Sequence, residues 1–390
     1  MKNLLSLKEL YHQELMNHII PFWEKYSPDT TCGGYYTCLD RQGNVFDTDK
    51  FMWLQGRQVW FFSMMYNQVE CRQSWLDLAL LGARFMEKHG RDKNGNWYFS
   101  LTREGKPLVQ PYNIFSDCFA CMAFAELYKA TGDSVHKTIA LETFHNIQTR
   151  SDNPKGLYNK LYPGTRPMKC FSLPMILSNL SLILEDVIGS DNVDKLVKPL
   201  IREVMEVFYQ KDSGLILENV ALDGSFMDCF EGRTVNPGHT NEATWFMMDL
   251  SERYNDLELM RKATNILLRS IEYGWDRQYN GIFYFRDIKG YPPQQLEWDQ
   301  KLWWVHIETL IALLKGYRLT GDSRCKDWFL KIHEYTWLHF RDTDFPEWYG
   351  YLNRQGEPLL TLKGGKWKGC FHVPRGLFQI WKTLESVPDL

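Results

Sequence analysis

Two short segments of the chain combine histidine with carboxylate or guanidinium side chains. "NPGHTNEATWF", residues 236–246, sets His239 and Glu242 three positions apart, directly after a Pro-Gly turn. "GCFHVPRGLFQIW", residues 369–381, does the same with His372 and Arg375. A neutral imidazole titrates close to neutral pH, so histidine is the usual side chain for taking and returning a proton. Two such histidines without a metal-ligand pattern point to acid–base chemistry.

Two further ionisable residues lie in segments that are otherwise apolar. Arg57 occurs in "FMWLQGRQVWFFSMMY" and Glu308 in "KLWWVHIETLIALL". An unpaired charge is costly to bury, so a function or a partner must retain each of them. An arginine can stabilise a developing oxyanion, and a glutamate can orient a histidine. The set fits removal of a proton next to a carbonyl group.

Each of these residues also has a purely structural interpretation. Thr240 or Asn241 could cap the helix after the Pro-Gly turn, and Glu242 would suit the positive end of that helix. Arg57 could form a structural ion pair with Glu308. His306 could be a hydrogen-bonded core histidine, and His372 could cap a loop. That all of them are incidental is the weaker hypothesis, because several predicted helices contribute to the set.

A repeated segment indicates how the chain could bring these residues together. Short strands, each followed by a Gly-containing polar turn and a second short segment, begin at Gly33, Gly95, Gly214, Gly281 and Trp348. A degenerate sixth copy begins at Gly156, in "GLYNKLYPG". The starts lie roughly sixty residues apart, the kind of regular spacing that marks a repeated supersecondary unit.

Helical periodicity fills the sequence between these turns. The predicted helices cover 4–25, 52–70, 73–89, 116–131, 134–148, 169–187, 191–209, 239–254, 256–274, 300–320, 323–340 and 367–385. The segments 52–70, 116–131, 239–254 and 300–320 are apolar nearly all round, whereas the helices after them carry more charge. This alternation predicts an all-α fold, an (α/α)6 barrel of twelve helices with short β-hairpins at one rim. No linker divides it, so we expect one domain over 1–390.

Composition limits the possible partners. The 45 basic and 48 acidic residues nearly balance and form no long block of one sign, which disfavours nucleic acid and anionic membranes. No apolar run reaches membrane-spanning length, and the N-terminus does not read as a signal peptide. Nine scattered cysteines, including the Cys118–Cys121 pair within a predicted helix, fit a reducing compartment. We therefore expect a cytoplasmic protein with a small-molecule ligand.

At these residues the sequence resembles the N-acylglucosamine 2-epimerase family, which also includes cellobiose 2-epimerases and aldose-ketose isomerases. "NPGHTNEATWF", "KLWWVHIE", "FHVPRG" and "WLQGRQVW" carry the resemblance, and it extends over essentially the whole chain. It implies an (α/α)6 barrel that epimerises sugars at C2 without a metal or a consumed cofactor. His239 and His372 would be the acid–base pair, and Arg57 would hold the C1 oxygen. Glu308 and Arg375 would support the pocket.

The resemblance also implies roles for further residues. Glu242 would tune His239 or assist ring opening, and Trp303 and Trp304 would form the pocket wall. Met175, Ile176 and Leu177 give the third inner helix an apolar lining that suits an N-acetyl methyl group. We therefore expect N-acetyl-D-glucosamine and N-acetyl-D-mannosamine as substrates.

An effector and an assembly state also follow from the resemblance. Members of this group are commonly stimulated by ATP that is not consumed. Lys155 or Lys160, in "TRSDNPKGLYNK", could hold its phosphates, although this segment could equally be an ordinary surface loop. "KGGKWKG", residues 363–369, is a second weak phosphate candidate. A homodimer is expected from the family.

Four other functions remain open at the level of the sequence. An unmodified sugar such as mannose, glucose or cellobiose could be epimerised or isomerised. A toroid-fold glycoside hydrolase could use Glu242 and Glu308 as its two carboxylates, but the histidines and Arg57 would then have no role. A polysaccharide lyase can share the toroid as well, because fold does not dictate function. A non-enzymatic role is the fourth, because mammalian members of the family have been described as renin-binding proteins.

Overall fold

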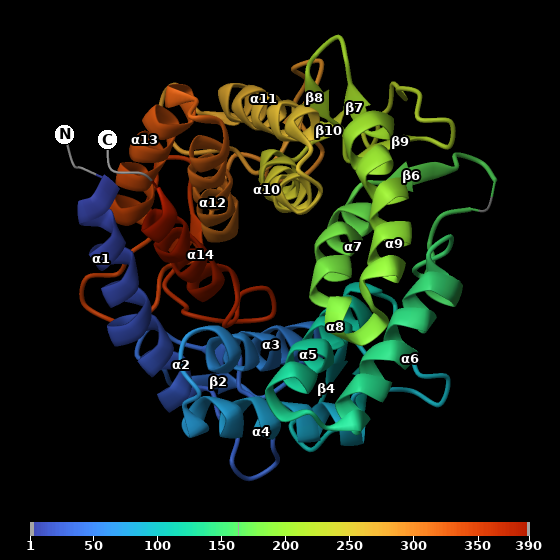
Figure 1. The fold of residues 1–390 in the computed structure, drawn as a ribbon, viewed down its shortest axis with the longest axis vertical. Helices are drawn as coiled ribbons and strands as arrows, with labels where there is room; N and C mark the ends of the chain where they lie inside the picture. Colours follow the sequence, from blue (N-terminus) through green and yellow to red (C-terminus); the bar gives the residue numbers. More distant parts are fainter. Residues whose placement is uncertain (1–3, 163, 388–390) are drawn as a thin grey trace.

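Two concentric sets of helices form a ring in the computed structural model, which describes residues 4–162 and 164–387 (Figure 1). The inner helices are α3 (Met52–Gln68), α5 (Phe115–Thr131), α7 (Ser172–Ile183), α10 (Pro237–Tyr254), α12 (Trp303–Thr320) and α14 (His372–Ser386). The outer helices are α1 (Leu4–Glu14), α4 (Gln73–His89), α6 (Ser134–Arg150), α9 (Ser190–Arg202), α11 (Leu257–Gly274) and α13 (Ser323–His339). The predicted (α/α)6 barrel is confirmed.

Burial distinguishes the two sets as the sequence pattern predicts. On α12 every residue from Trp303 to Tyr317 is buried. On α11 the exposed positions recur every three or four residues, at Glu258, Arg261, Asn265, Arg269 and Glu272, and the residues between them face the ring. An inner helix is covered on both sides, so it is apolar all round, whereas an outer helix needs only one apolar stripe.

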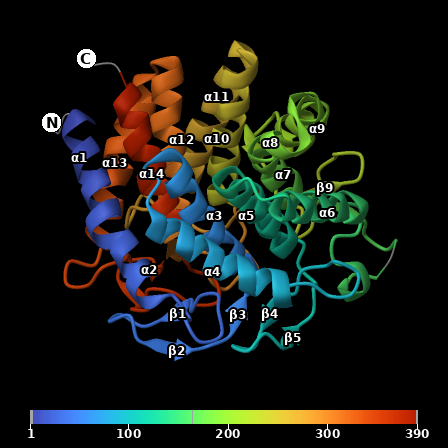
Figure 2. The same cartoon turned by 60° about the horizontal axis from the view of Figure 1, so that its bottom comes forward.

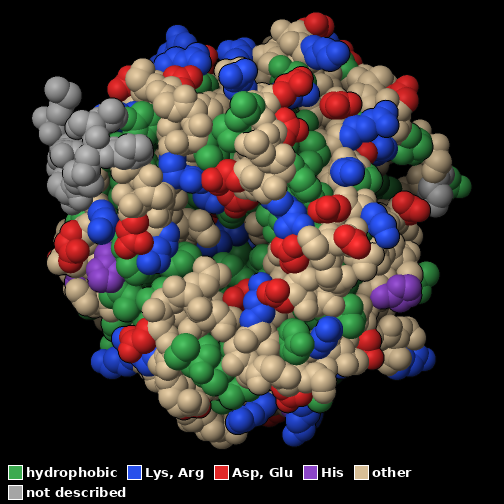
Figure 3. Space-filling model, viewed as in Figure 1, with side chains coloured by type: hydrophobic (Ala, Val, Ile, Leu, Met, Phe, Trp, Pro, Cys, Tyr) green, Lys and Arg blue, Asp and Glu red, His purple; other side chains and the backbone are tan. Residues whose placement is uncertain are grey.

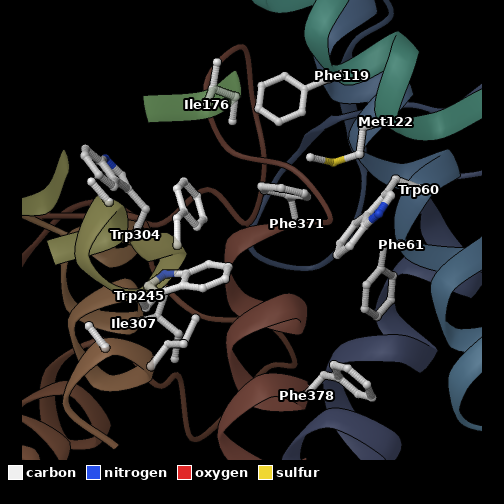
Figure 4. Close-up of a cluster of buried hydrophobic side chains, with 14 of the residues drawn as sticks. Trp60, Phe61, Phe119, Met122, Ile176, Trp245, Trp304, Ile307, Phe371 and Phe378 are labelled. Atoms are coloured by element: carbon white, nitrogen blue, oxygen red, sulfur yellow. The ribbon is translucent and has the colours of Figure 1, made fainter. Parts of the chain in front are cut away.

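Close helix packing closes the ring. The first helix, α1, packs against the last, α14, and Figure 1 shows the two ends of the chain on the same side of the molecule. Between α3 and α5 a glycine sets the spacing, because a Cβ on Gly56 would lie 2.7 Å from the Phe119 carbonyl oxygen. Figure 4 shows Phe371, at the start of α14, with Phe119 and Trp60 on either side. Its ring centroid lies 5.4 Å from each of theirs.

Three predicted helices are interrupted. The segment 4–25 divides into α1, a π-helical turn (Leu15–Ile19) and α2 (Ile20–Tyr26). Pro21 has no amide hydrogen for the helix, and the Ile20 amide bonds to the Leu15 carbonyl five residues back. The segment 169–187 divides into α7 and α8 (Glu185–Ile188), and 191–209 ends as α9 followed by a second π turn (Glu203–Val207).

Four helix starts also differ from the prediction by two residues or more. The helix predicted from 169 begins at Ser172, the one from 239 at Pro237, the one from 300 at Trp303, and the one from 367 at His372. Lys301 and Leu302, which precede α12, form a strand instead. Strand pairing therefore replaces the first residues of the predicted helix ahead of α7 and α12.

Short antiparallel strands gather at one end of the helices, where Figure 2 shows β1–β5. Three of the five repeated segments form local hairpins, as predicted: β1 (Cys38–Leu39) with β2 (Val45–Asp47), β4 (Ser100–Leu101) with β5 (Pro107–Val109), and β13 (Tyr351–Leu352) with β14 (Pro358–Leu360). In two places the strand ahead of an inner helix joins the next hairpin, as β3 (Lys50–Phe51) joins β4 and β12 (Lys301–Leu302) joins β13.

The remaining repeats were wrongly predicted to be local hairpins. After Gly214, β8 (Leu215–Ile216) pairs with β7 (Tyr209–Gln210), and β9 (Asn219–Ala221) pairs with β6 (Met168–Cys170). After Gly281, β11 (Arg286–Asp287) pairs with β10 (Thr234–Val235). The Gly156 segment forms only a 3₁₀ turn. Strands of two or three residues are too short to reveal their partners in a sequence.

A buried Asp–Lys–Arg group recurs three times along this rim. In the first, Asp29 accepts from Lys50 Nζ at 2.9 Å and from Arg103 Nε at 2.9 Å. The other two groups are Asp276 with Lys301 and Arg354, and Asp342 with Lys363 and Arg41. The three aspartates come directly after α2, α11 and α13, and the three arginines lie in the turns of the β4–β5, β13–β14 and β1–β2 hairpins. The Arg41–Asp342 pair therefore ties the first hairpin to the last repeat.

These groups hold their aspartates ionised. Burial alone would raise the pKa of Asp342, but hydrogen bonds from Arg41 and Lys363 outweigh it and hold the pKa well below its ordinary value. A carboxylate with a depressed pKa contributes stability above its unfolded-state pKa, and this contribution is lost as the pH falls toward the folded-state pKa. The ion pairs of the rim therefore stabilise the fold at neutral pH and stabilise it less at acid pH.

We expect Asp342→Asn to lower the free energy of unfolding by about 3–5 kcal/mol, because it leaves the buried Lys363 ammonium without its carboxylate. Urea unfolding at pH 7 measures this loss. Glu70→Gln, in an exposed pair with Arg72, is the control and should change stability little. The difference between wild type and Asp342→Asn should shrink below about pH 4. Equal stability of the two variants would contradict this account of the rim.

Candidate active site

A cavity of about 580 Å³ lies within the ring. Of the residues singled out from the sequence, Arg57, His239, Glu242, Trp303, Trp304 and His372 line it. Glu308 and Arg375 lie behind this wall, fully buried, and hydrogen-bond to residues that line the cavity. Lys155 and Lys160 do not line it, because both are exposed on the loop between α6 and β6. Figure 3 shows the face of the ring seen in Figure 1, hollowed at its centre among charged side chains.

Arg375 joins three inner helices below the cavity. Its Nη2 donates to Glu242 Oε1 of α10 at 2.5 Å and to Glu308 Oε1 of α12 at 2.6 Å. The second Glu308 oxygen accepts from Trp245 Nε1 at 3.0 Å. Charge-assisted hydrogen bonds of this length are strong, and at this depth each charge needs the others. The cluster fixes α10, α12 and α14 relative to one another.

Glu242, Glu308 and His372 each offer a metal-ligand atom, and these atoms lie within 4.8 Å of one another. The Arg375 guanidinium, however, already donates to both carboxylates. A divalent cation there would place two positive groups on the same oxygen atoms, so the donor set fits a guanidinium better than a metal ion.

His372 is held as a neutral base. Its Nδ1 lies 2.8 Å from Glu308 Oε1, which leaves Nε2 as the second ring nitrogen of a residue that lines the cavity. Burial and the nearby Arg57 guanidinium lower the pKa of His372 well below its ordinary value. At neutral pH this imidazole is therefore ready to accept a proton.

His239 has the opposite electrostatic environment. Its Nδ1 lies 3.0 Å from Glu218 Oε2, and 27 % of the side chain is exposed. Burial lowers the pKa of His239, but the Glu218 carboxylate raises it by more, and Glu242 adds to that effect. The resulting pKa lies above the ordinary value, so His239 carries its proton more readily than His372.

Neither Thr240 nor Asn241, the two possible caps that the sequence offered, is the N-cap of α10. Asn236 is the N-cap, and its side-chain oxygen accepts from the His239 amide at 3.1 Å. Pro237 then occupies the first helical turn, where its missing amide hydrogen costs nothing. Gly238 permits a close approach, because a Cβ there would lie 2.7 Å from a ring carbon of Trp304. The turn thus places His239 beside Trp304, with ring centroids 5.2 Å apart.

Arg57 does not form the ion pair with Glu308 that the sequence left open. Its guanidinium carbon lies over the rings of Trp53, Phe119 and Phe371, at 4.4, 4.0 and 4.6 Å. Within residues 4–162 and 164–387 no carboxylate lies within 4.0 Å of it, and its Nε is buried without a hydrogen-bond partner. Burial lowers the pKa of Arg57 to about 9, so it remains a cation at neutral pH. It can offer its N–H groups to a substrate oxygen.

One structural alternative from the sequence is confirmed, and one weak phosphate candidate is not supported. His306 is a buried core histidine, which accepts from the Ile282 amide at 3.0 Å and has its other nitrogen 2.7 Å from the Leu302 carbonyl. Burial lowers the pKa of His306 to about 3. Of the lysines in "KGGKWKG", Lys363 and Lys368 are buried in ion pairs with Asp342 and Glu347, so this segment does not offer them to a phosphate.

The apolar side of the cavity is formed partly by the residues expected from α7. Met175 and Ile176 line it, together with Phe115 and Phe119 of α5. Leu177 does not belong to the lining and instead packs against the core. Figure 4 shows Ile176 beside Phe119. The cavity therefore has a charged side, formed by α10 and α14, and an apolar side.

The family model described as N-acylglucosamine 2-epimerase matches residues 34–373. The chain belongs to the N-acylglucosamine 2-epimerase family. It is 40% identical to the N-acylglucosamine 2-epimerase of Rattus norvegicus over 388 residues, which cover 97% of this chain and 92% of the relative. The human protein of the same name is 38% identical over 99% of this chain and 92% of its own length.

Solved structures agree on the fold. Cellobiose 2-epimerase from Bacillus thermoamylovorans superposes with a TM-score of 0.83 at 20% identity, over 97% of this chain and 99% of that one. A D-mannose isomerase gives a TM-score of 0.81 at 18% identity, over 97% and 98%. In the described part of this family member, no helix is both long and apolar enough to cross a membrane.

Sequence reasoning missed several residues of this epimerase-family cavity, and Glu218 matters most. It lies next to β9 in the rim, and its backbone links two elements, because its carbonyl accepts from the Phe171 amide and its amide donates to the Thr234 carbonyl. The only signal in the sequence was its position in the repeat that begins at Gly214. Tyr284, Glu297, Gln300, Tyr351 and Trp367 also line the cavity, and all of them come from the rim segments between helices.

The pKa values of the two histidines should lie on opposite sides of the ordinary value for histidine. In ¹⁵N-imidazole NMR we expect His239 to titrate above pH 6.5 and His372 to stay neutral well below it. Glu218→Gln removes the carboxylate that favours imidazolium, so the His239 pKa should fall below 6.5 while His372 changes little. The exposed His145 serves as an internal reference. A His239 pKa that Glu218→Gln leaves unchanged would refute the role of Glu218.

Proposed function

We propose that this chain interconverts N-acetyl-D-glucosamine and N-acetyl-D-mannosamine by deprotonating C2 of the opened sugar and returning a proton to the opposite face. One observation carries the proposal. Two histidines line one sugar-sized cavity, each with Nδ1 paired to a glutamate, and they differ in protonation. The curated relatives at 38–40% identity are N-acylglucosamine 2-epimerases and support the choice of substrate.

The proton has a defined path in this proposal. In one direction the neutral His372 takes the C2 proton, the electron pair moves into an enediolate, and the imidazolium of His239 gives a proton to the other face of C2. After this step His372 is protonated and His239 is neutral. Proton exchange with solvent then returns His372 to its neutral form and His239 to its imidazolium form. The reverse reaction uses the same groups with their roles exchanged, as microscopic reversibility requires.

Arg57 would bind the developing negative charge on the C1 oxygen. The three aromatic rings that surround its guanidinium accept no strong hydrogen bond, so its N–H groups remain for the substrate. Preorganised charge in a water-poor site stabilises such an intermediate more than water does. Glu242 lines the same cavity and is one candidate to assist ring opening. Glu308 and Arg375 act through their neighbours and are positioning residues.

A glycoside hydrolase reading is less well supported. A hydrolase needs two carboxylates placed about 5–10 Å apart on either side of the scissile bond. Here Glu242 and Glu308 both bind the same Arg375 nitrogen, and Glu308 does not line the cavity, so the two carboxylates are not placed on either side of a bound sugar. A GH76 α-mannanase shares the ring with a TM-score of 0.60 at 10% identity, which is a likeness of fold alone.

We expect His239→Ala and His372→Ala each to lower kcat for N-acetylglucosamine epimerisation about 10²–10⁴-fold, because each removes the only proposed proton carrier for one face. Proton NMR of the two anomeric regions follows the reaction. His145→Ala, which removes an exposed histidine of the outer ring, is the control and should keep full activity. Full turnover by either cavity variant, with its fold intact by circular dichroism, would exclude that histidine from the mechanism.

The apolar wall supports an acetamido group over a plain hydroxyl at C2. We expect Ile176→Ser to raise KM for N-acetylglucosamine about 5–50-fold, the effect of one or two lost apolar contacts, and to leave any turnover of mannose or glucose unchanged. Leu177→Ser, on the same helix but outside the lining, is the matched control. If the two variants change KM equally, Ile176 does not contact the acetyl group.

Three further properties form part of the proposal. We propose that ATP activates the enzyme without being consumed, and the exposure of Lys155 and Lys160 is compatible with phosphate binding by their loop. We propose a homodimer, for which the measured mass should be about twice 46.2 kDa. We also propose a cytoplasmic location, supported by nine cysteines that are all free thiols.

A further inference from the structure

The apolar side of the catalytic cavity contains an amide side chain. Asn113 lies in the turn before α5 and lines the cavity together with Phe115 and Ile176. In the described chain, the only other polar lining residue from α5, α7 and the turns before them is Ser172. Its hydroxyl lies 3.2 Å from Cys170 Sγ. Asn113 is therefore the main polar group on a wall that is otherwise aromatic and aliphatic.

The backbone fixes the orientation of the Asn113 amide. Asn113 Oδ1 accepts from the Phe115 amide at 2.9 Å. A backbone N–H can only donate, so the side-chain oxygen must take this position and the NH₂ group must take the opposite one. Within residues 4–162 and 164–387, Asn113 Nδ2 makes no hydrogen bond. A residue that lines the cavity thus keeps two unused N–H donors.

The turn that carries Asn113 is anchored from behind. Arg150 Nη1 donates to Asp117 Oδ1, which is fully buried, at 3.0 Å, and Arg150 Nη2 donates to the Pro111 carbonyl at 3.4 Å. The Asn113 carbonyl accepts from the Ser116 amide at 3.2 Å. The backbone is therefore held on both sides of Asn113. A donor that is already in place costs little ordering when a ligand binds.

An amide donor on an apolar wall matches the chemistry of an acetamido group. The methyl group of the ligand is apolar and suits Ile176 and Phe115. Its carbonyl oxygen accepts hydrogen bonds and would lose free energy if it were buried against apolar side chains alone. The charged residues of the cavity lie on α10 and α14, on its other side. Asn113 Nδ2 is the donor that the apolar side supplies.

We propose that Asn113 Nδ2 donates to the carbonyl oxygen of the substrate's acetamido group, so that Asn113 distinguishes N-acetylated sugars from sugars with a hydroxyl at C2. This inference rests on the proposed function and names the residue that binds the polar part of the acetyl group, whereas Ile176 contacts its methyl group. Asn113 takes no part in proton transfer and is a specificity-determining residue.

Asn113→Asp tests the role of the NH₂ group alone. Aspartate caps a helix start as well as asparagine does, so the hydrogen bond from the Phe115 amide and the fold should be kept. The oxygen that replaces Nδ2 can only accept, and it would face the acetamido carbonyl as a second acceptor. We expect binding of the N-acetylated sugar to weaken about tenfold or more. Asn94→Asp, an exposed change of the same charge outside the cavity, is the matched control.

Isothermal titration calorimetry with the 1-deoxy analogues of N-acetylglucosamine and glucose measures this effect. Both analogues lack the C1 hydroxyl, so they cannot open and their binding does not depend on turnover. We expect Asn113→Asp to weaken binding of the acetamido analogue and to leave binding of the glucose analogue unchanged, whereas Asn94→Asp should bind both as the wild type does. Equal weakening of both analogues, or wild-type affinity of Asn113→Asp for the acetamido analogue, overturns the proposal.

Turnover separates this inference from the proposed function. We expect Asn113→Asp to raise KM for N-acetylglucosamine by the same factor as it weakens the acetamido analogue. An unchanged KM in an active Asn113→Asp protein would exclude the role of Asn113 and leave the epimerase reaction standing. A wild type that binds the acetamido analogue through Asn113 but does not epimerise N-acetylglucosamine would exclude the proposed reaction and support the role of Asn113.

Discussion

The buried Arg375 guanidinium is the constraint on which the rest of the site depends. It neutralises Glu242 and Glu308, which lie on two neighbouring inner helices and would otherwise face each other as unpaired charges. Because Glu308 also holds His372 Nδ1, the same cluster that joins α10, α12 and α14 orients one of the two proposed proton carriers. The same buried ion pairs therefore determine both the packing of these inner helices and the orientation of His372.

The difference between the two histidines follows from their distance to this cluster. His372 is buried next to two guanidinium groups, and its glutamate partner shares its negative charge with Arg375, so a second proton is unfavourable. His239 is partly exposed, and its own partner, Glu218, belongs to the rim and lies outside the cluster. Two residues of the same type thus receive opposite roles from their surroundings, as acid–base pairs generally do.

Much of this arrangement could be predicted from the sequence. The alternation of apolar inner helices with more charged outer helices predicts the ring. Ionisable residues within apolar segments identify Arg57, Glu308 and the histidine pair as candidates, because a charged group is costly to bury without a reason. What could not be predicted were choices between partners. Glu308 could have paired with Arg57 or Arg375, and only the three-dimensional packing decides. Glu218 sits in an ordinary polar rim segment, 21 residues before His239, where no periodicity marks it.

The local capping of α10 shows the same limit. The sequence offered Thr240 and Asn241 as caps, but the cap is Asn236, and the helix begins earlier than the apolar pattern suggested because Pro237 suits a first turn. The strand partners of the rim were missed for a related reason. They are two or three residues long, and in two pairings, β3 with β4 and β12 with β13, the strand carries the lysine of an Asp–Lys–Arg group that joins positions far apart in the chain.

The central claim is that two different groups serve the two faces of C2. Its most direct test is the wild-type reaction in deuterated water, followed by proton NMR in both sugars at early times. The account predicts N-acetylmannosamine that carries deuterium at C2 from the first turnover, while the remaining N-acetylglucosamine keeps its proton. Product that retains the substrate's own C2 proton would contradict the account, because one group would then carry the proton between the faces.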